Sequence, residues 1–143
     1  MTFPYAYMNG LLHLGHAFSM TKCDFNAWYK RLCGFNVLFP FGFHCTGMPI
    51  SAAAKKLNME FEEFGNPPKF PLDPEGKPKK GQYNILEQMG ISQKEIPDFT
   101  DPVHWVRYFP PIGRRHLKRF GTHIDEKRSF ITTDLNPYYN SFI

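Results

Sequence analysis

Apolar and polar positions along the first third of the chain predict a strand, a helix and a second strand. Residues 2–8 form a short apolar run, typical of a buried strand. A helix is predicted over residues 15–32, where large apolar residues recur at spacings of seven, four and three and therefore share one face. The residues on that face are Phe18, Phe25, Tyr29 and Leu32.

Residues 35–43 are almost continuously apolar, which suits a strand buried on both faces of a parallel sheet. Proline cannot donate to a strand ladder, so the regular part is expected to stop at Pro40. Strand, helix and strand in this order form a βαβ unit with a right-handed crossover. Because doubly wound sheets bind ligands at the carboxyl ends of their strands, residues 5–10 and 42–47 are expected in one crevice.

The middle of the chain predicts a helix followed by a loop. Residues 49–65 begin with a proline and end with Gly65, as helices commonly do. Residues 66–82 are rich in Pro, Gly and Lys and are interpreted as a surface loop. Its lysines could touch RNA, but a solvated loop is the favoured interpretation.

The last third is predicted to be mainly helical, with one more strand. A helix over residues 103–108 is expected to break at Pro110-Pro111, and a basic helix over residues 112–120 follows. Residues 129–133 are interpreted as a strand. A solvated surface is the favoured interpretation of the basic helix, and contact with RNA is the alternative. Its basic residues are Arg114, Arg115, Lys118 and Arg119.

Composition bounds the class of protein. The 143 residues suffice for one domain with a real core, and a hydrophobic content of 42% argues against a disordered tail. The chain contains no run of 18 apolar residues, so no membrane span is predicted. A net charge of +4 permits an RNA partner without requiring one.

The three cysteines predict neither a disulfide framework nor a zinc site. Cys23, Cys33 and Cys45 are odd in number and lack Cys-x-x-Cys spacing, which favours a reducing, cytosolic compartment. His44 next to Cys45 invites a thiolate nucleophile, but neighbours on an extended segment point to opposite sides. The catalytic thiol is therefore a minor alternative.

Two histidines stand where the first strand turns into the first helix. His13 and His16 flank Gly15 at the predicted helix start. A helix N-terminus offers unpaired N–H groups and a positive dipole end, which suit an anion. Gly15 lets a ligand approach the backbone, and each imidazole can donate an N–H to phosphate. The pair alone is a weak signal, but the string around it is more specific.

That string, FPYAYMNG at residues 3–10 followed by HLGH at residues 13–16, resembles the first signature of class I aminoacyl-tRNA synthetases. The form YxYMNGxLHLGH is similar to leucyl-tRNA synthetases of the cytosolic eukaryotic or archaeal type. LFPFGFHCTGMPI at residues 38–50 is similar to the segment that lines their amino-acid pocket. RSFITTDLNPYY at residues 128–139 is similar to the stretch that leads into their editing domain.

The resemblance implies the first half of a doubly wound, parallel, Rossmann-like α/β sheet with an additional helical insertion. Residues 1–60 would carry the nucleotide and leucine site, and residues 66–82 the loop. Residues 83–121 would be the helical region, and residues 128–143 the strand and turn before the editing domain. All of residues 1–143 would then belong to the N-terminal half of the catalytic domain.

The resemblance also implies the reaction and its participants. Leucine and ATP, with Mg²⁺ on the nucleotide, would give leucyl-adenylate, and leucine would then pass to the 3′-terminal adenosine of tRNA(Leu). No zinc is expected in this segment. The expected location is the cytoplasm, a multi-synthetase assembly is a candidate partner, and no membrane partner is expected.

Residue roles follow by the same likeness. His13 and His16 are expected to be catalytic, because they would hold the ATP phosphates in the transition state. Leucine and its ammonium group would be surrounded by Phe3, Tyr5 and His44. The expected ATP-binding residues are Tyr7, Met8, Asn9, Gly10, His13, Gly15 and His16.

Two departures from the family pattern matter. Asp125-Glu126-Lys127-Arg128 stands where the family usually has Asp-Trp-Arg-Arg, which is expected to affect local packing and not the nucleotide site. The second signature, Lys-Met-Ser-Lys-Ser, is missing from these 143 residues. We therefore expect a piece of a longer protein that does not complete activation alone.

Two other functions stay open at this point. Nucleotidylyltransferases share the His-x-Gly-His box and the fold, but they lack the Phe-Gly-Phe-His-Cys-Thr-Gly stretch. A truncated synthetase-like module could instead bind RNA or a protein partner, or act as a scaffold. A longer gene with an editing domain and the second signature would favour the enzyme.

Overall fold

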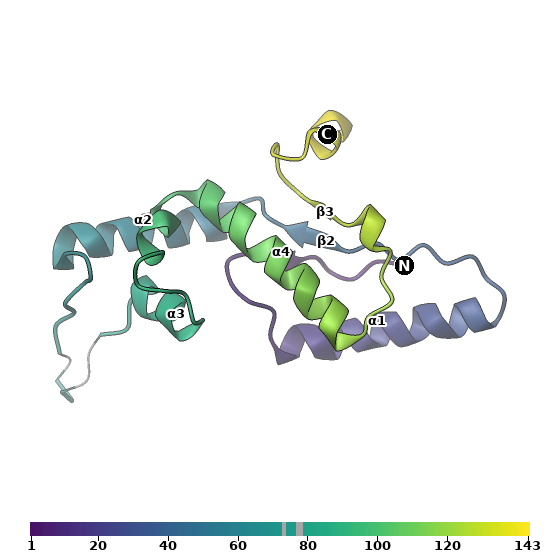
Figure 1. Cartoon of the computed structure of the whole chain (residues 1–143), viewed down its shortest axis with the longest axis horizontal. Coiled ribbons are helices and arrows are strands. Elements are labelled where there is room, and N and C mark those ends of the chain that lie inside the picture. The colour runs from purple at the N-terminus through teal and green to yellow at the C-terminus, as the bar shows by residue number, and fades with distance from the viewer. Residues whose placement is uncertain (73, 77–78) are drawn as a thin grey trace. The chain divides into compact units, whose positions relative to one another are not determined.

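The computed structural model describes residues 1–72, 74–76 and 79–143 (Figure 1). Three residues of the predicted 66–82 loop, at positions 73, 77 and 78, lie outside the described residues. The chain forms two compact units. The first unit combines residues 1–46 with residues 108–143, and the second contains residues 47–107.

A three-stranded parallel sheet lies in the first unit. Its order is β1 (Ala6–Tyr7), β2 (Gly42–His44) and β3 (Phe130–Ile131), so the strands follow one another across the sheet as they do along the chain. The predicted parallel α/β arrangement is confirmed. The paired positions are Ala6 with Phe43, Tyr7 with His44, Gly42 with Phe130 and Phe43 with Ile131.

The strands are shorter than the apolar runs predicted, and the prediction that the second strand stops at Pro40 is wrong. Strand β2 lies after this proline, not before it. The Phe39 N–H donates to Asp125 Oδ2 at 2.6 Å, and the Phe39 carbonyl accepts from the Asp125 N–H at 2.8 Å. An acidic side chain therefore holds the segment before the proline.

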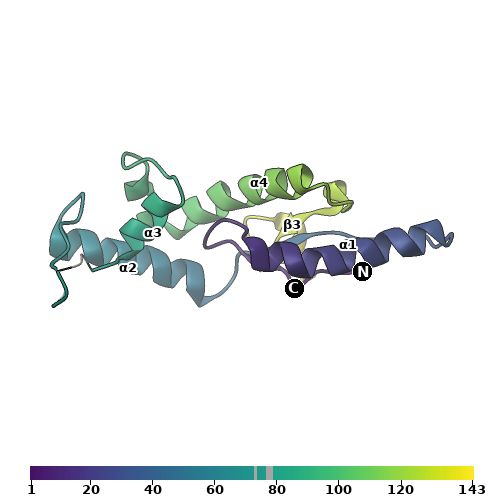
Figure 2. The ribbon, with the colours of Figure 1, turned by 90° about the horizontal axis from the view of Figure 1, so that it is seen from below.

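Helix α1 (Leu14–Leu32) runs as one unbroken helix, as Figure 2 also shows. The apolar face that periodicity singled out is exposed, with Phe18 at 64%, Phe25 at 70% and Leu32 at 79%. The buried residues of α1 are Met20, Asp24 and Ala27. The hydrophobic period located a helix correctly, but it did not identify the side that packs inside this unit.

The second unit is helical. Helix α2 (Met48–Phe64) confirms the predicted helix over residues 49–65, and it packs against α3 (Gln82–Gln88) and the 3₁₀ helix η1 (Ile96–Thr100). Glu60 on α2 is buried, and its carboxylate accepts the Gln82 N–H at 2.6 Å and the Tyr83 N–H at 3.0 Å. One carboxylate thus satisfies the first donors of α3.

Helix α4 (Pro102–Phe120) continues through Pro110 and Pro111, so the predicted break there is wrong. A proline inside a helix removes a hydrogen bond and costs about 3 kcal/mol, but burial of an apolar face can offset that loss. The buried side chains of α4 include Trp105, Val106, Phe109 and Leu117. The chain continues through η2 (Glu126–Arg128) to α5 (Pro137–Phe142).

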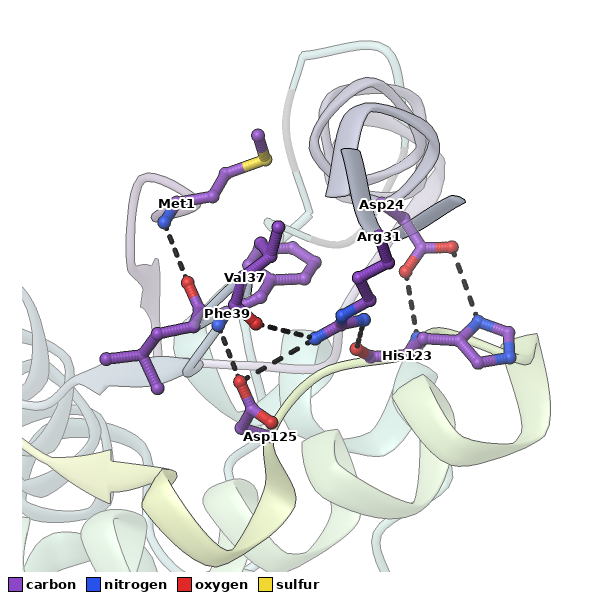
Figure 3. Close-up of polar contacts among 8 residues, drawn as sticks. Met1, Asp24, Arg31, Val37, Phe39, His123 and Asp125 are labelled. Carbon is purple, nitrogen blue, oxygen red and sulfur yellow. Dashed lines mark hydrogen bonds and ion pairs between the residues drawn. The ribbon is translucent and has the colours of Figure 1, made fainter. Parts of the chain in front are cut away.

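A polar cluster fastens α1 to the segment before β3 (Figure 3). The His123 N–H donates to Asp24 Oδ1 at 2.8 Å, and Arg31 Nη1 donates to the His123 carbonyl at 3.0 Å. Arg31 Nη2 also donates to the Val37 carbonyl at 3.2 Å and lies 3.8 Å from Asp125 Oδ2. The first residue of the DEKR stretch therefore keeps a structural role.

Among the described residues, no helix combines the length and the apolar character that crossing a membrane requires.

We predict that Asp24→Ala lowers the free energy of unfolding by about 1–3 kcal/mol, because it leaves the His123 N–H without its acceptor. Thermal or urea unfolding measures the change. Asn26→Ala, an exposed change on the same helix, is the control and should stay within about 0.5 kcal/mol of the parent. Equal stabilities of the two variants would contradict the role of the cluster.

Candidate active site

The strand-to-helix corner is closed by its own two histidines. His13 is the N-cap of α1, and its Nδ1 accepts the Gly15 N–H at 3.1 Å. In return His16 Nδ1 accepts the His13 N–H at 3.2 Å. This reciprocal pair is a capping box in which both cap positions are imidazoles.

The capping bonds decide where the imidazole protons lie. A ring nitrogen that accepts an N–H carries no proton, so each neutral ring holds its proton on Nε2. The two ring centroids are 4.0 Å apart, which places the rings side by side. The corner therefore offers two Nε2–H donors. One of the N–H groups at this helix start, that of Gly15, is already bonded to His13.

The need for glycine at position 15 has a more local explanation than the approach of a ligand. A Cβ at this position would lie 3.0 Å from His13 Cε1 and 3.1 Å from His13 Nδ1. Such contacts are tighter than van der Waals packing allows without movement, so a side chain here would push the ring off its cap. Glycine between the histidines thus preserves the pair.

His16 is held in its neutral form. Burial lowers the pKa of His16 below its ordinary value of 6.5, and the neighbouring His13 lowers the pKa further. A neutral imidazole can still donate an N–H to an anion, and it can remain in place when the charge on that anion changes.

A second feature of this unit is a cavity of about 560 Å³ at the carboxyl ends of β2 and β3. Tyr5 and His44, two of the three residues expected to surround leucine, both line it, and their contact with leucine stays a prediction. A Cβ on Gly42 would lie 2.9 Å from the Tyr5 ring, so glycine at this position makes room for the tyrosine. The other lining residues are Thr46, Phe130, Thr132, Asn136, Tyr138, Tyr139 and Phe142.

His44 is fixed from two sides. The Tyr7 ring stacks on it with centroids 3.9 Å apart, and Thr46 Oγ1 lies 3.2 Å from His44 Nδ1. Tyr7 and His44 are partners in the β1–β2 register. The pairing of β1 with β2 therefore places Tyr7, at the end of β1, next to a residue that lines the aromatic cavity.

The structure does not gather every predicted leucine and ATP residue at one place. Phe3 is buried, stacks on Phe41 with centroids 5.3 Å apart, and lines a different cavity of about 300 Å³ beside His13 and His16. Met8 is fully buried, and its backbone N–H donates to the His44 carbonyl at 3.0 Å. Its contribution is to the strand pairing.

Asn9 is exposed and Gly10 is half-buried in the bend after β1, so both lie on the path from the sheet to the histidine corner. Their contact with a nucleotide remains a prediction.

Sequence reasoning missed several residues around the two cavities. His116 on α4 lines the smaller cavity together with His13 and His16, but it lay within a run interpreted only as basic. Phe130, Thr132 and Tyr139 line the larger cavity. The signal for these three is present in the sequence, because all three belong to the stretch RSFITTDLNPYY.

Asn136 explains how Tyr139 reaches the cavity. Its Oδ1 accepts the N–H groups of Tyr138 and Tyr139 at 3.2 and 3.4 Å, and its Nδ2 donates to the Ile131 carbonyl at 3.3 Å. One side chain thus caps α5 and ties this helix to β3.

Cys45 is not an activated nucleophile. Its side chain is buried, and burial raises the pKa of the thiol to about 12, although a backbone contact with Thr132 opposes part of that rise. The thiol is therefore protonated at neutral pH. All three cysteines are free thiols, and the described residues contain no group of three or more His, Cys, Asp or Glu side chains placed to hold a metal ion.

A parallel sheet with an imidazole pair at a strand-to-helix corner is consistent with the first half of a class I synthetase domain. The family model described as tRNA synthetases class I (M) matches residues 1–69.

Relatives that align with the chain from end to end narrow the assignment. The chain is 46% identical to the cytoplasmic leucine–tRNA ligase of Pongo abelii, in an alignment that covers 100% of the present chain. It is 47% identical to that of Dictyostelium discoideum, with 99% of the present chain covered. It is 43% identical to that of Arabidopsis thaliana over 99%. The chain belongs to the leucyl-tRNA synthetase family. It spans 14%, 16% and 16% of the length of these relatives.

We predict that His13→Asn raises the titration midpoint of His16. Asparagine keeps an acceptor at the N-cap but removes the neighbouring imidazole charge. The midpoint should stay below 6.5, since burial is the larger cause of the lowered pKa. An NMR titration of the imidazole protons measures it, with His123 in the same spectra as the internal control. An unchanged His16 midpoint would show that His13 has no electrostatic effect.

We predict that iodoacetamide at pH 8 alkylates Cys45 at least about a hundredfold more slowly than Cys33, because a buried thiol with a raised pKa supplies little thiolate. Cys33 is exposed and serves as the reference thiol. Mass spectrometry of peptides at timed intervals gives both rates. In urea the two rates should become equal, whereas fast labelling of folded Cys45 would restore the nucleophile hypothesis.

Proposed function

We propose that this chain is the part of a leucyl-tRNA synthetase that holds the phosphates of ATP and binds leucine for the formation of leucyl-adenylate. The observation that carries the proposal is the reciprocal capping of His13 and His16 through Nδ1 at the start of α1, from which we infer a pair of Nε2–H donors. These donors belong to the same unit as the aromatic cavity. Strand β1, which leads to the histidine corner, pairs through Tyr7 with His44, and His44 lines that cavity.

In the proposed reaction the protein positions the substrates rather than forming covalent bonds with them. A leucine carboxylate oxygen attacks the α-phosphorus of ATP in line, the new C–O–P bond forms, and the bond to the pyrophosphate oxygen breaks. Negative charge moves onto the departing pyrophosphate. His13 and His16 would stabilise that charge by donating from Nε2, aided by the positive end of the α1 dipole.

ATP would bring Mg²⁺ with it. The described residues offer no cluster of three metal-ligating side chains, so the phosphates themselves would supply most of the ligands.

The aromatic cavity suits leucine by shape. Tyr5, Phe130 and Tyr139 give it apolar walls that can accept a branched aliphatic side chain. An apolar pocket discriminates one methylene by only ~1–3 kcal/mol. A synthetase therefore needs a second check on small apolar amino acids, which agrees with the similarity of the stretch before residue 143 to the approach to an editing domain.

Transfer to tRNA is the second half of the proposed function. The relatives are named leucine–tRNA ligases, and the four basic side chains near the end of α4 are exposed and could meet RNA phosphates. The cytoplasm is the proposed location because the relatives are named cytoplasmic enzymes. Membership of a multi-synthetase assembly stays a prediction.

We predict that His16→Ala slows leucine-dependent ATP–pyrophosphate exchange by roughly a hundredfold or more in the full-length ligase that carries this segment, as loss of a transition-state donor would. His16→Gln is the matched variant, because a glutamine at this position can still complete the capping box. It should keep the stability of the parent and still slow the exchange. An unchanged exchange rate in His16→Ala would refute the role of the imidazole.

A further inference from the structure

A third cavity, a groove of about 540 Å³, lies between α1 and the turn that follows α4, within the first unit. Its walls are large apolar side chains that all remain exposed. Burial of such side chains is what stabilises most helices in proteins, so exposed ones on a helix call for a partner. The wall residues are Phe25, Trp28, Tyr29, Leu32 and Phe120.

Helix α1 has apolar residues on two sides. Met20 and Ala27 are buried on the side that faces its own unit. The four wall residues of α1 follow one another at spacings of three, one and three, so they form a stripe on a different side of the helix. A helix with two apolar sides needs two packing partners, and the described part of the unit supplies only the first.

The floor of the groove is fixed by polar contacts. Asp24 is buried, and its Oδ1 accepts the His123 N–H at 2.8 Å (Figure 3). The Trp28 ring meets the His123 ring edge-on, with the centroids 4.2 Å apart. Because these contacts hold the floor and one wall in place, the groove is preformed, and a partner that enters it loses little free energy to ordering.

The family supplies the partner. The chain aligns from end to end with leucine–tRNA ligases, yet it spans only 14%, 16% and 16% of the length of three of them. Most of such a ligase therefore lies outside residues 1–143. A segment on the same polypeptide meets the groove at a high effective concentration, which favours it over a second copy or a separate protein.

We infer that the groove between α1 and the end of α4 is an internal interface of the full-length ligase, covered by an apolar element of the chain outside residues 1–143. This inference rests on the proposal that these residues are part of such a ligase. The element buries the aromatic side of α1, and it thereby steadies the helix whose first turn carries His13 and His16. The histidine corner thus depends on a segment that these 143 residues do not contain.

The test labels single cysteines in the full-length ligase. Phe25→Cys places a thiol in the wall of the groove, and Asn26→Cys places one at the next position, which is exposed and does not line the groove. In the folded ligase, iodoacetamide should alkylate Phe25→Cys at least about a hundredfold more slowly than Asn26→Cys, since a covered thiol reacts only when the interface opens. Mass spectrometry of peptides gives both rates, which should become equal in urea.

A second measurement needs no substitution, so it also serves if Phe25→Cys disturbs folding. Hydroxyl radicals oxidise exposed Trp and Tyr side chains, and the reference is a synthetic peptide of residues 21–34. In the unsubstituted ligase, Trp28 and Tyr29 should be oxidised at least about tenfold more slowly than in the peptide.

Sedimentation of the same samples identifies the occupant. Protection in the monomeric ligase without RNA is the expected result. Protection only in dimers would identify a second copy, and protection only after tRNA is added would identify RNA. Either result would overturn the inference, as would equal alkylation of the two cysteine variants or oxidation at the rate of the peptide. Failure of the proposed function would look different, because ATP–pyrophosphate exchange would then be independent of His16 while the groove stayed protected.

Discussion

Parallel pairing of β2 with a strand on each side is the constraint on which the site depends. The ladder is short, yet it sets Tyr7 beside His44 and Gly42 beside Phe130. Parallel strands end on the same edge, so the residues after each strand converge there. The first strand continues toward the imidazole corner, and the second and third strands supply the walls of the aromatic cavity.

A second set of contacts keeps these short strands in place. Asp125 pairs with the backbone of Phe39 just before β2, and the buried Asp24 fixes the turn at His123 from the side of α1. Both carboxylates bond to backbone N–H groups, which are costly to leave unpaired when buried. The departure from the usual family sequence at residues 126 and 127 therefore leaves the critical aspartate intact.

The two cavities suit different chemical groups of the proposed reaction. The smaller cavity presents the imidazoles of His13 and His16 for an anion, and the larger one presents aromatic surface with His44. The buried Cys45 lies between Thr46 and β2, and its raised thiol pKa keeps it out of the chemistry. Its backbone N–H nevertheless anchors Thr132, so the residue acts through its main chain.

The sequence by itself determined the histidine corner, the parallel α/β class and the family, because these depend on residues close together in the chain. A capping box spans three residues, and its spacing is visible in HLGH. Tertiary structure decided the buried side of α1, the continuity of α4 through two prolines and the start of β2 after Pro40. It also decided the contact of Thr46 with Thr132, 86 residues away, and of His123 with Asp24, 99 residues away. Periodicity reports only which residues share a face. The partner of that face depends on burial and hydrogen bonding between distant segments.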